Sequence, residues 1–139
     1  RTGARAPMQW NSGKNKGFSD TDGELYLPVD TDPNAHTVEA QENDPASMLN
    51  FVRGLIALRQ NNEDLGNYSP FEVYSAEEGS RVFAYKRGEL LVAMNPGVDT
   101  EELMLDGQYE SIYALGVSVI REDKLTLGSQ SFVVLKPIK

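Results

Sequence analysis

The first ten residues, RTGARAPMQW, hold the side chains of this chain that are best suited to bind a ligand. Arg1 and Arg5 lie four residues apart, and Met8, Gln9 and the only tryptophan, Trp10, follow them. A guanidinium group stays charged and offers several hydrogen-bond donors in one fixed plane, so it can hold a carboxylate. These residue types are typical of a binding loop.

The other chemically capable side chains favour structural explanations. His36 is the only histidine, and a lone histidine in a polar loop is expected to be an ordinary surface residue. The segments DTDGE (20–24) and DTDPN (30–34) alternate oxygen-bearing side chains as calcium loops do, but neither follows the full calcium pattern, so we expect turns. The acidic residues fall mostly in turns and at alternate strand positions, where a solvated face explains them. No catalytic residue, metal ligand or cofactor is therefore expected.

Composition limits the possible partners and the cellular location. The 139 residues fit one domain, or one small domain plus the remnant of another. The net charge of -8 argues against nucleic acid and anionic membranes, because phosphate binding needs clustered lysine and arginine. The absence of cysteine excludes a disulfide framework and a thiolate metal site. It also fits a bacterial-type cytoplasm, which is the expected location, although many secreted bacterial proteins lack cysteine too.

One segment has a strong helical pattern. Residues 1–42 are polar and irregular, whereas residues 43–60 predict a helix with Asp44 as N-cap and Pro45 at the first helical position. The apolar residues of this segment form a stripe at helical spacing, namely Met48, Val52, Leu55 and Ile56, widened by Leu49, Phe51 and Leu58. A helix this apolar is normally buried on more than one side.

The pattern changes to short strands from about Phe71 onward. Turn signals separate seven runs: FEVYS (71–75), RVFAYKR (81–87), ELLVAMN (89–95), EELML (101–105), YESIYAL (109–115), VSVI (117–120) and SFVVLK (131–136). A hairpin turn is expected near Arg87–Gly88. Such runs indicate an antiparallel sandwich or barrel. The predicted fold class is mainly β with one long helix, the β part forming an antiparallel β-sandwich.

The opening decamer resembles the R-x-x-x-R-T-P-M-Q-W stretch of the α-amylase clan of glycoside hydrolases, above all its α-glucosidase, oligo-1,6-glucosidase and dextran glucosidase branch. Three further segments follow in the same order as in that family: GKNKGFS (13–19), LYLPVD (25–30) and HTVEAQENDPASMLNFVRGLIALR (36–59). They are similar to its NAGFS, PWLPVN and INVEAQ…DP-S…LI-LR segments. Thr2, Ala6 and Asn11 depart from the family pattern, which leaves the linkage specificity open.

The resemblance implies a domain organisation. The family's catalytic domain is a (β/α)8 barrel, and its active sites are built by loops at the C-terminal ends of the strands. Residues 1–65 would be a remnant of that barrel, namely its last loop and its last helix. Residues 66–139 would be the C-terminal β-sandwich domain, which caps and stabilises the barrel.

The resemblance also implies a function. Family members hydrolyse α-glucosidic bonds with retention, using two carboxyl groups on the middle barrel strands. Those motifs are absent from this sequence, so the chain alone is expected to be inactive. Arg1 would pair with an upstream aspartate at the floor of the glucose pocket, and Arg5 would support the same loop. Trp10 could stack on a sugar ring, although packing is favoured. The substrate would be an α-glucan or an oligosaccharide.

Two other readings stay open. The chain could be a stand-alone carbohydrate-binding β module, which would need exposed aromatic side chains on a platform. It could also be an interaction domain, a reading that is compatible with a barrel-capping role. Because the apolar face of the 45–60 helix must find cover, we also expect the chain by itself to form a homodimer, with or without swapped segments.

Overall fold

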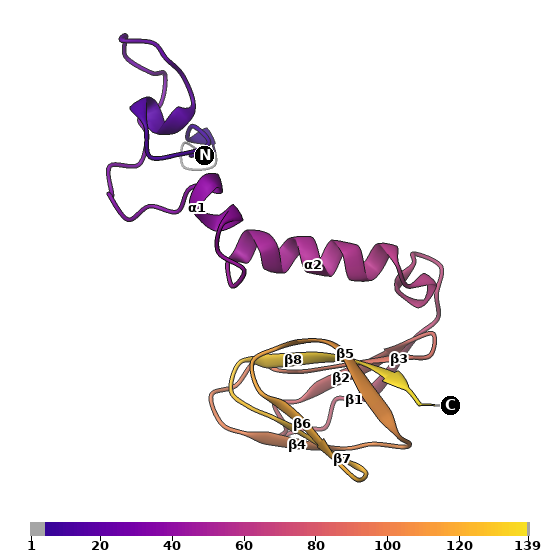
Figure 1. Cartoon of the computed structure of the whole chain (residues 1–139). Helices are drawn as coiled ribbons and strands as arrows, with labels where there is room; N and C mark the ends of the chain where they lie inside the picture. Colours follow the sequence, from indigo (N-terminus) through magenta and orange to yellow (C-terminus); the bar gives the residue numbers. More distant parts are fainter. Residues whose placement is uncertain (1–4, 139) are drawn as a thin grey trace. The chain divides into compact units, whose positions relative to one another are not determined.

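A computed structural model describes residues 5–138 of the chain (Figure 1). The chain divides into two compact units, Arg1–Ala57 and Leu58–Lys139. The first unit contains long irregular segments, a 3-10 turn η2 (Lys14–Gly17), a short helix α1 (Val38–Glu42) and most of the long helix α2 (Met48–Gln60). The second unit begins with the last turn of α2 and the 3-10 turn η3 (Glu63–Leu65), and continues into the β-strands.

The long helix begins later than the sequence predicts. Its first residue is Met48, whereas the pattern of Asp44 and Pro45 predicted a start near Pro45, and this prediction is wrong. Asp44 caps a turn instead: its Oδ1 accepts the N–H of Ala46 at 2.9 Å, and its carbonyl accepts the N–H of Ser47 at 3.0 Å. Ser47 is the residue that caps α2, because its Oγ accepts the N–H of Asn50 at 3.2 Å.

Helix α1 was not expected from the sequence. Thr37 caps it by accepting the N–H of Ala40 on Oγ1 at 3.2 Å, and Thr37 is itself buried. Glu39 lies in the first turn, where a negative charge interacts favourably with the helix dipole. Five residues are too few to show the apolar period by which a helix is recognised in a sequence.

The second unit is an antiparallel β-sandwich, as predicted. One sheet has the strand order β1-β2-β3-β8-β5 and the other β4-β7-β6; both can be followed in Figure 1. The strands are β1 (Phe71–Ser75), β2 (Phe83–Arg87), β3 (Leu90–Asn95), β4 (Glu101–Met104), β5 (Tyr109–Leu115), β6 (Ser118–Arg121), β7 (Lys124–Leu127) and β8 (Ser131–Pro137). Every pairing is antiparallel.

Strand β7 was not predicted from the sequence, because REDK and LGSQ, which include its two end residues, were assigned to turns. It is only four residues long, yet it lies between β4 and β6 and joins the small sheet. Leu125 and Leu127 alternate with Lys124 and Thr126, and both leucines are fully buried. This alternation is the signal that a shorter search window would have found.

The β2–β3 hairpin turns one residue later than expected. Arg87 pairs with Leu90, so the two turn residues are Gly88 and Glu89. Gly88 has φ +56°, in the left-handed region, and the carboxylate of Asp64 lies where a side chain at this position would start, 2.0 Å from an ideal Cβ. The left-handed backbone conformation favours glycine here, whereas the Asp64 carboxylate is the end of a flexible side chain that can move aside.

The main core lies between the two sheets. It is built by inward-facing residues of both layers, among them Leu91, Leu103, Leu125, Leu127, Val133 and Leu135. A second cluster lies on the opposite face of the large sheet, where Leu90, Val92 and Val134 contact Leu58 from the last turn of α2 and Leu65 from η3. Strand β3 is therefore covered on both faces, which explains its nearly continuous apolar sequence.

Asn95 is a polar residue inside the sandwich, with 0% of its surface exposed. Its Nδ2 donates to the carbonyl oxygens of Asp99 at 2.8 Å, Gly128 at 2.9 Å and Leu127 at 3.3 Å. Its Oδ1 accepts the N–H of Gly97 at 2.9 Å. One side-chain amide thus joins the end of β3, in the large sheet, to the end of β7, in the small sheet. It also gives a hydrogen-bond donor to carbonyls at and beyond the strand ends.

We predict that Asn95→Asp strongly destabilises the second unit. A carboxylate cannot donate to the three carbonyl oxygens around Nδ2, and it would be a buried charge without a partner, which costs about 3–5 kcal/mol. Urea denaturation of the full chain, followed by the fluorescence of its aromatic residues, measures this loss. Gln108→Glu makes the same chemical change at an exposed position of the same unit and should change stability by less than about 0.5 kcal/mol. Equal effects of the two changes would contradict the assignment.

Candidate functional site

The predicted binding residues lie at the start of the first unit. Arg1 lies outside the described residues, and so do Thr2, Gly3 and Ala4. Arg5 is described and exposed. The predicted pairing of Arg1 with an aspartate therefore lies outside the described residues, and the structure shows how the segment that follows Arg5 is held.

The main chain of Gln9 and Trp10 is held by α1. The carbonyl of Gln9 accepts the N–H of Val38 at 2.9 Å, and the carbonyl of Trp10 accepts the N–H of Glu39 at 2.9 Å. These N–H groups belong to the first turn of a helix, where they have no partner within the helix itself. The predicted binding loop thus uses the free donors of α1 at Gln9 and Trp10, and in return α1 fixes the path of these two residues.

An unusual left-handed turn closes the same loop. Asn15, Lys16 and Gly17 have φ values of +47°, +56° and +72°. The carbonyl of Lys16 accepts the N–H groups of Trp10 at 2.8 Å and of Asn11 at 3.2 Å, which ties the turn to the loop. Non-glycine residues adopt this backbone region at a cost of about 1 kcal/mol or more each, and such strain concentrates at functional sites.

Two asparagines support this turn. The Nδ2 of Asn15 donates to the carbonyls of Ser19 and Thr21, both at 3.0 Å. The Oδ1 of Asn11 accepts the N–H of Gly13 at 2.9 Å, and the amide of Asn11 lies 2.7–2.8 Å from the place of a Cβ on Gly17. Asn11, one of the departures from the family pattern, thus fills the space beside Gly17.

Apolar side chains around the loop are only partly covered. Met8 is 51% exposed, Trp10 48% and Phe18 51%. Packing was the favoured role for Trp10, but the described residues do not bury its indole. The side-chain Oε1 of Gln9 is different, since it is shielded from solvent and has no hydrogen-bond partner among the described residues.

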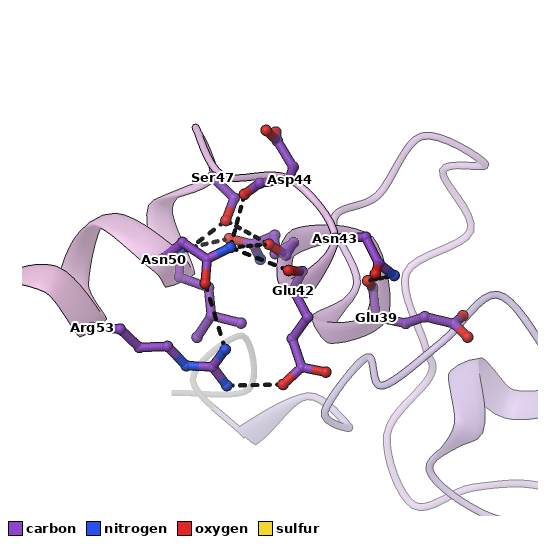
Figure 2. Close-up of polar contacts among 9 residues, drawn as sticks. Glu39, Glu42, Asn43, Asp44, Ser47, Asn50 and Arg53 are labelled. Carbon is purple, nitrogen blue, oxygen red and sulfur yellow. Dashed lines mark hydrogen bonds and ion pairs between the residues drawn. The ribbon is translucent and has the colours of Figure 1, made fainter.

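A cluster of polar side chains joins α1 to α2 (Figure 2). The Nδ2 of Asn50 donates to the carbonyls of Gln41 at 2.9 Å, Asp44 at 2.8 Å and Glu42 at 3.3 Å. The Oγ of Ser47 donates to the carbonyl of Gln41 at 2.6 Å. These bonds satisfy the carbonyls at the end of α1, which is the usual need of a helix C-terminus.

Further bonds reinforce this junction. The side-chain Oε1 of Gln41 accepts the N–H of Leu49, in the first turn of α2, at 3.1 Å. Arg53 and Glu42 form an exposed ion pair at 2.8 Å, which Figure 2 also shows. The binding loop, α1 and the first turns of α2 are thus one hydrogen-bonded assembly, and no functional signal in the sequence pointed to it.

The two candidate calcium segments form turns. In residues 30–34, Asp30 accepts the N–H of Asp32 at 2.9 Å and Asp32 accepts the N–H of Asn34 at 2.8 Å. In residues 20–24, Thr21 accepts the N–H of Gly23 at 3.1 Å, while Asp22 forms an ion pair with Lys14. Within residues 5–138, three or more His, Asp or Glu side chains nowhere gather to hold a metal ion. His36 is exposed, in keeping with a surface role.

An ionisable cluster lies on the second unit. The carboxylate of Asp106 accepts a hydrogen bond from Lys86 Nζ on Oδ2 at 2.6 Å and one from the Tyr109 hydroxyl on Oδ1 at 2.7 Å. Lys86 also lies 5.0 Å from the centre of the Tyr74 ring.

Burial, followed by the hydrogen bond to Asp106, raises the pKa of Tyr109 to about 12. The hydrogen bonds from Lys86 and Tyr109 lower the pKa of Asp106. Both carboxylate oxygens are engaged, so the cluster is a structural clamp between β2 and β5.

The clamp makes the stability of the second unit depend on pH at both ends of the pH range. The pKa of Tyr109 is raised, so its contribution to stability is complete below pH 10 and is lost as the pH rises towards about 12. The pKa of Asp106 is lowered, so its contribution is present above pH 3.8 and is lost as the pH falls below it.

We expect Asp106→Asn to lower the pKa of Tyr109 while leaving it above 10.0, because burial remains. NMR titration of the tyrosine ring signals measures this, with Tyr109→Phe to assign the resonance. Asp99→Asn, which removes the exposed ion pair with Arg81, should leave the titration of Tyr109 unchanged. An unchanged Tyr109 pKa in Asp106→Asn would rule the clamp out.

Comparison with known proteins gives the first unit a family likeness. Residues 1–67 match the sequence model described as "Alpha amylase, catalytic domain". The chain is 44% identical over 87 residues to a Bacillus subtilis (strain 168) protein named "Probable oligo-1,6-glucosidase 2", a match that covers 63% of this chain and 15% of that protein. It is 32% identical over 118 residues to the glucan 1,6-alpha-glucosidase of Streptococcus pneumoniae serotype 4, which covers 81% of this chain and 21% of that enzyme.

The likeness extends to three-dimensional structure and to both units. The crystal structure of the trehalulose synthase from Pseudomonas mesoacidophila MX-45 superposes with a TM-score of 0.78 and 26% identity, covering 96% of this chain and 25% of that enzyme. The chain therefore spans between about a seventh and a quarter of the length of these relatives.

Proposed function

We propose that the chain is a segment of an α-amylase-clan glucosidase and that the whole protein cleaves α-glucosidic bonds with retention of configuration. One observation carries the proposal: residues 1–67 match the catalytic domain of that family. The order of the motifs, from RTGARAPMQW to the apolar helix, supports it. The substrate would be an α-glucan or an oligosaccharide.

We propose that residues 1–65 complete a (β/α)8 barrel and that residues 66–139 cap and stabilise it. The exposure of α2 supports this role. All thirteen residues of α2 are described and none is buried, and Met48, Val52 and Ile56 are 67%, 42% and 52% exposed. A helix with an uncovered apolar side needs a partner surface. In the proposed enzyme the barrel would supply that surface.

The site residues take supporting roles in this proposal. Arg1 would hold an aspartate at the floor of the glucose pocket, and Arg5 would support the loop. A guanidinium suits the first role, because its planar donors can bond a carboxylate and sugar hydroxyls together. The anchoring of Gln9 and Trp10 on α1 supports the proposal, because a fixed main chain would hold the preceding arginines in place.

The reaction itself would need groups outside this sequence. A retaining mechanism uses two carboxyl groups about 5–5.5 Å apart. The described carboxylates lie in turns, in the helical segments α1 and η3, in ion pairs or on strands. A glucosyl group needs an acceptor, and the relatives include proteins named as glucosidases and one named as a trehalulose synthase. We propose that water is the acceptor in this protein.

We also propose a cytoplasmic location. Within residues 5–138, no helix has the length and apolar character to cross a bilayer.

The activity of a chimaera tests the proposed function. We expect the purified chain to release no glucose from isomaltose, maltose or a chromogenic α-glucoside. The same 139 residues, exchanged for the matching segment of the B. subtilis relative, should give an active hydrolase. In that chimaera, Arg1→Gln should lower kcat/KM by about 100-fold, because a charge-assisted hydrogen bond contributes about 1.5–3 kcal/mol.

Lys14→Gln is the control, since Lys14 forms an exposed ion pair in the same segment, and it should leave kcat/KM within about twofold. Steady hydrolysis by the chain alone would refute the proposal. A folded chimaera in which Arg1→Gln and Lys14→Gln have the same kcat/KM would refute the role of Arg1.

The isolated chain should associate through α2. We propose a homodimer, with or without swapped segments, because Met48, Val52 and Ile56 lie at helical spacing and are exposed. Light scattering of the chain should give twice the monomer mass, and Val52→Lys should shift it to the monomer. Val98→Lys is the control: Val98 is 71% exposed on the second unit, so its exchange should leave the mass unchanged. A monomer in all three proteins would contradict the expectation.

A further inference from the structure

A hollow in the second unit is lined by two arginines. It has a volume of about 380 Å³, and its lining residues are Arg59, Leu65, Asn67, Phe71, Tyr85 and Arg87. All six belong to the second unit, and none belongs to the binding loop of the first. None of the described residues that line the hollow is acidic. The lining thus has two positive charges on a chain whose net charge is -8.

One loop holds both guanidinium groups. Arg59, from the last turn of α2, donates from Nη2 to the side-chain oxygen of Asn67, and Arg87, at the end of β2, donates from Nη2 to the carbonyl of Gly66. A guanidinium has five N–H donors, so these bonds orient each group and leave most of its donors unused. Arg87 Nε is shielded from solvent and has no acceptor among the described residues. A donor on a charged group is costly to leave unpaired.

The rest of the hollow is apolar and partly aromatic. The rings of Phe71 and Tyr85 lie with centroids 5.2 Å apart and planes inclined by 31°. Phe71 is 56% exposed, so its ring is accessible. Leu65 completes the apolar part of the lining. Such a surface can take the flat face of a ring, while the adjacent guanidinium groups can form paired hydrogen bonds to an oxyanion.

We propose that this hollow binds an oxyanion, the phosphate or carboxylate group of a small ligand whose body is a flat ring. The two arginines hold the anion, and Phe71, Tyr85 and Leu65 contact the ring. The whole chain repels anions at long range, so affinity must come from the two guanidinium groups that line the same hollow. The proposal is independent of the glucosidase assignment, since it uses no residue of the proposed glucose pocket.

NMR titration of the full, labelled chain tests the site with three probes of the same ring. Phenyl phosphate and benzoate carry an oxyanion, and phenyl glucoside is neutral. We expect saturable shifts in the amide signals of residues 65–69, 71 and 85–88 with an anionic probe, weakened by added salt, and none with phenyl glucoside. The tighter of the two anionic probes identifies the group that the site prefers.

The matched variants are Arg59→Gln and Arg121→Gln. Both arginines are exposed in the second unit, but only Arg59 lines the hollow. Arg59→Gln should weaken binding of the anionic probe by about tenfold or more, because a charge-assisted bond is lost, and Arg121→Gln should leave it unchanged. Equal binding of phenyl glucoside, equal affinity in both variants, or the absence of saturable shifts with both anions would overturn the proposal.

Discussion

The side-chain amide of Asn50 is the interaction on which the arrangement of the first unit depends. It donates to the carbonyls of Gln41 and Glu42, in the last turn of α1, and of Asp44, between α1 and α2. Backbone carbonyls at such a place need partners, and no strand or helix supplies them. Because α1 in turn holds the main chain of Gln9 and Trp10, the path of the binding loop is set by a residue forty positions further along the chain.

The second unit uses the same physical solution in a different setting. Asn95 lies fully buried where β3 leaves the large sheet, and its amide bonds carbonyls near the end of β7. Apolar packing between the sheets supplies most of the stability of a sandwich but is not directional. A buried amide is directional, since it fits only where carbonyls converge on it, and it therefore fixes how the two layers are registered at that end.

The sequence revealed those features that have a local pattern. The strands of the large sheet were predicted because β-branched and aromatic residues alternate between turn signals, and the apolar stripe of α2 was visible at helical spacing. The predicted start of α2 was wrong because Asp44 and Ser47 are both residues that can cap a helix. Only their bonds to Ala46 and Asn50 show which of them caps α2. Strand β7 was missed because the assigned turns, REDK and LGSQ, include its first and last residues, Lys124 and Leu127, and leave only two residues between them.

The roles of Arg1 and Arg5 stay predictions, whereas the bonds that hold the segment after them could not be predicted from the sequence. Arg1 and Arg5 were singled out by their chemistry and by a resemblance that the comparisons confirmed. The bonds that join Gln9 and Trp10 to Val38 and Glu39 link main-chain atoms some 29 residues apart, and main-chain bonds of this kind leave no trace in side-chain patterns. The hollow with Arg59 and Arg87 was missed for a related reason, because its two charges come from separate elements.

The closed hydrogen-bond network of residues 9–53 has an evolutionary consequence. Every described bond that orients the Gln9–Trp10 main chain or joins α1 to α2 begins and ends within this stretch. A genetic crossover upstream of Gln9 or downstream of Arg53 would transfer it intact, as a cassette, into another member of the clan. A crossover between Gln41 and Asn50 would separate the amide of Asn50 from the carbonyls it bonds, and these carbonyls would keep a donor only where the second parent also has an amide at that position. Recombination within the clan should therefore be tolerated at the borders of this stretch and selected against in its middle.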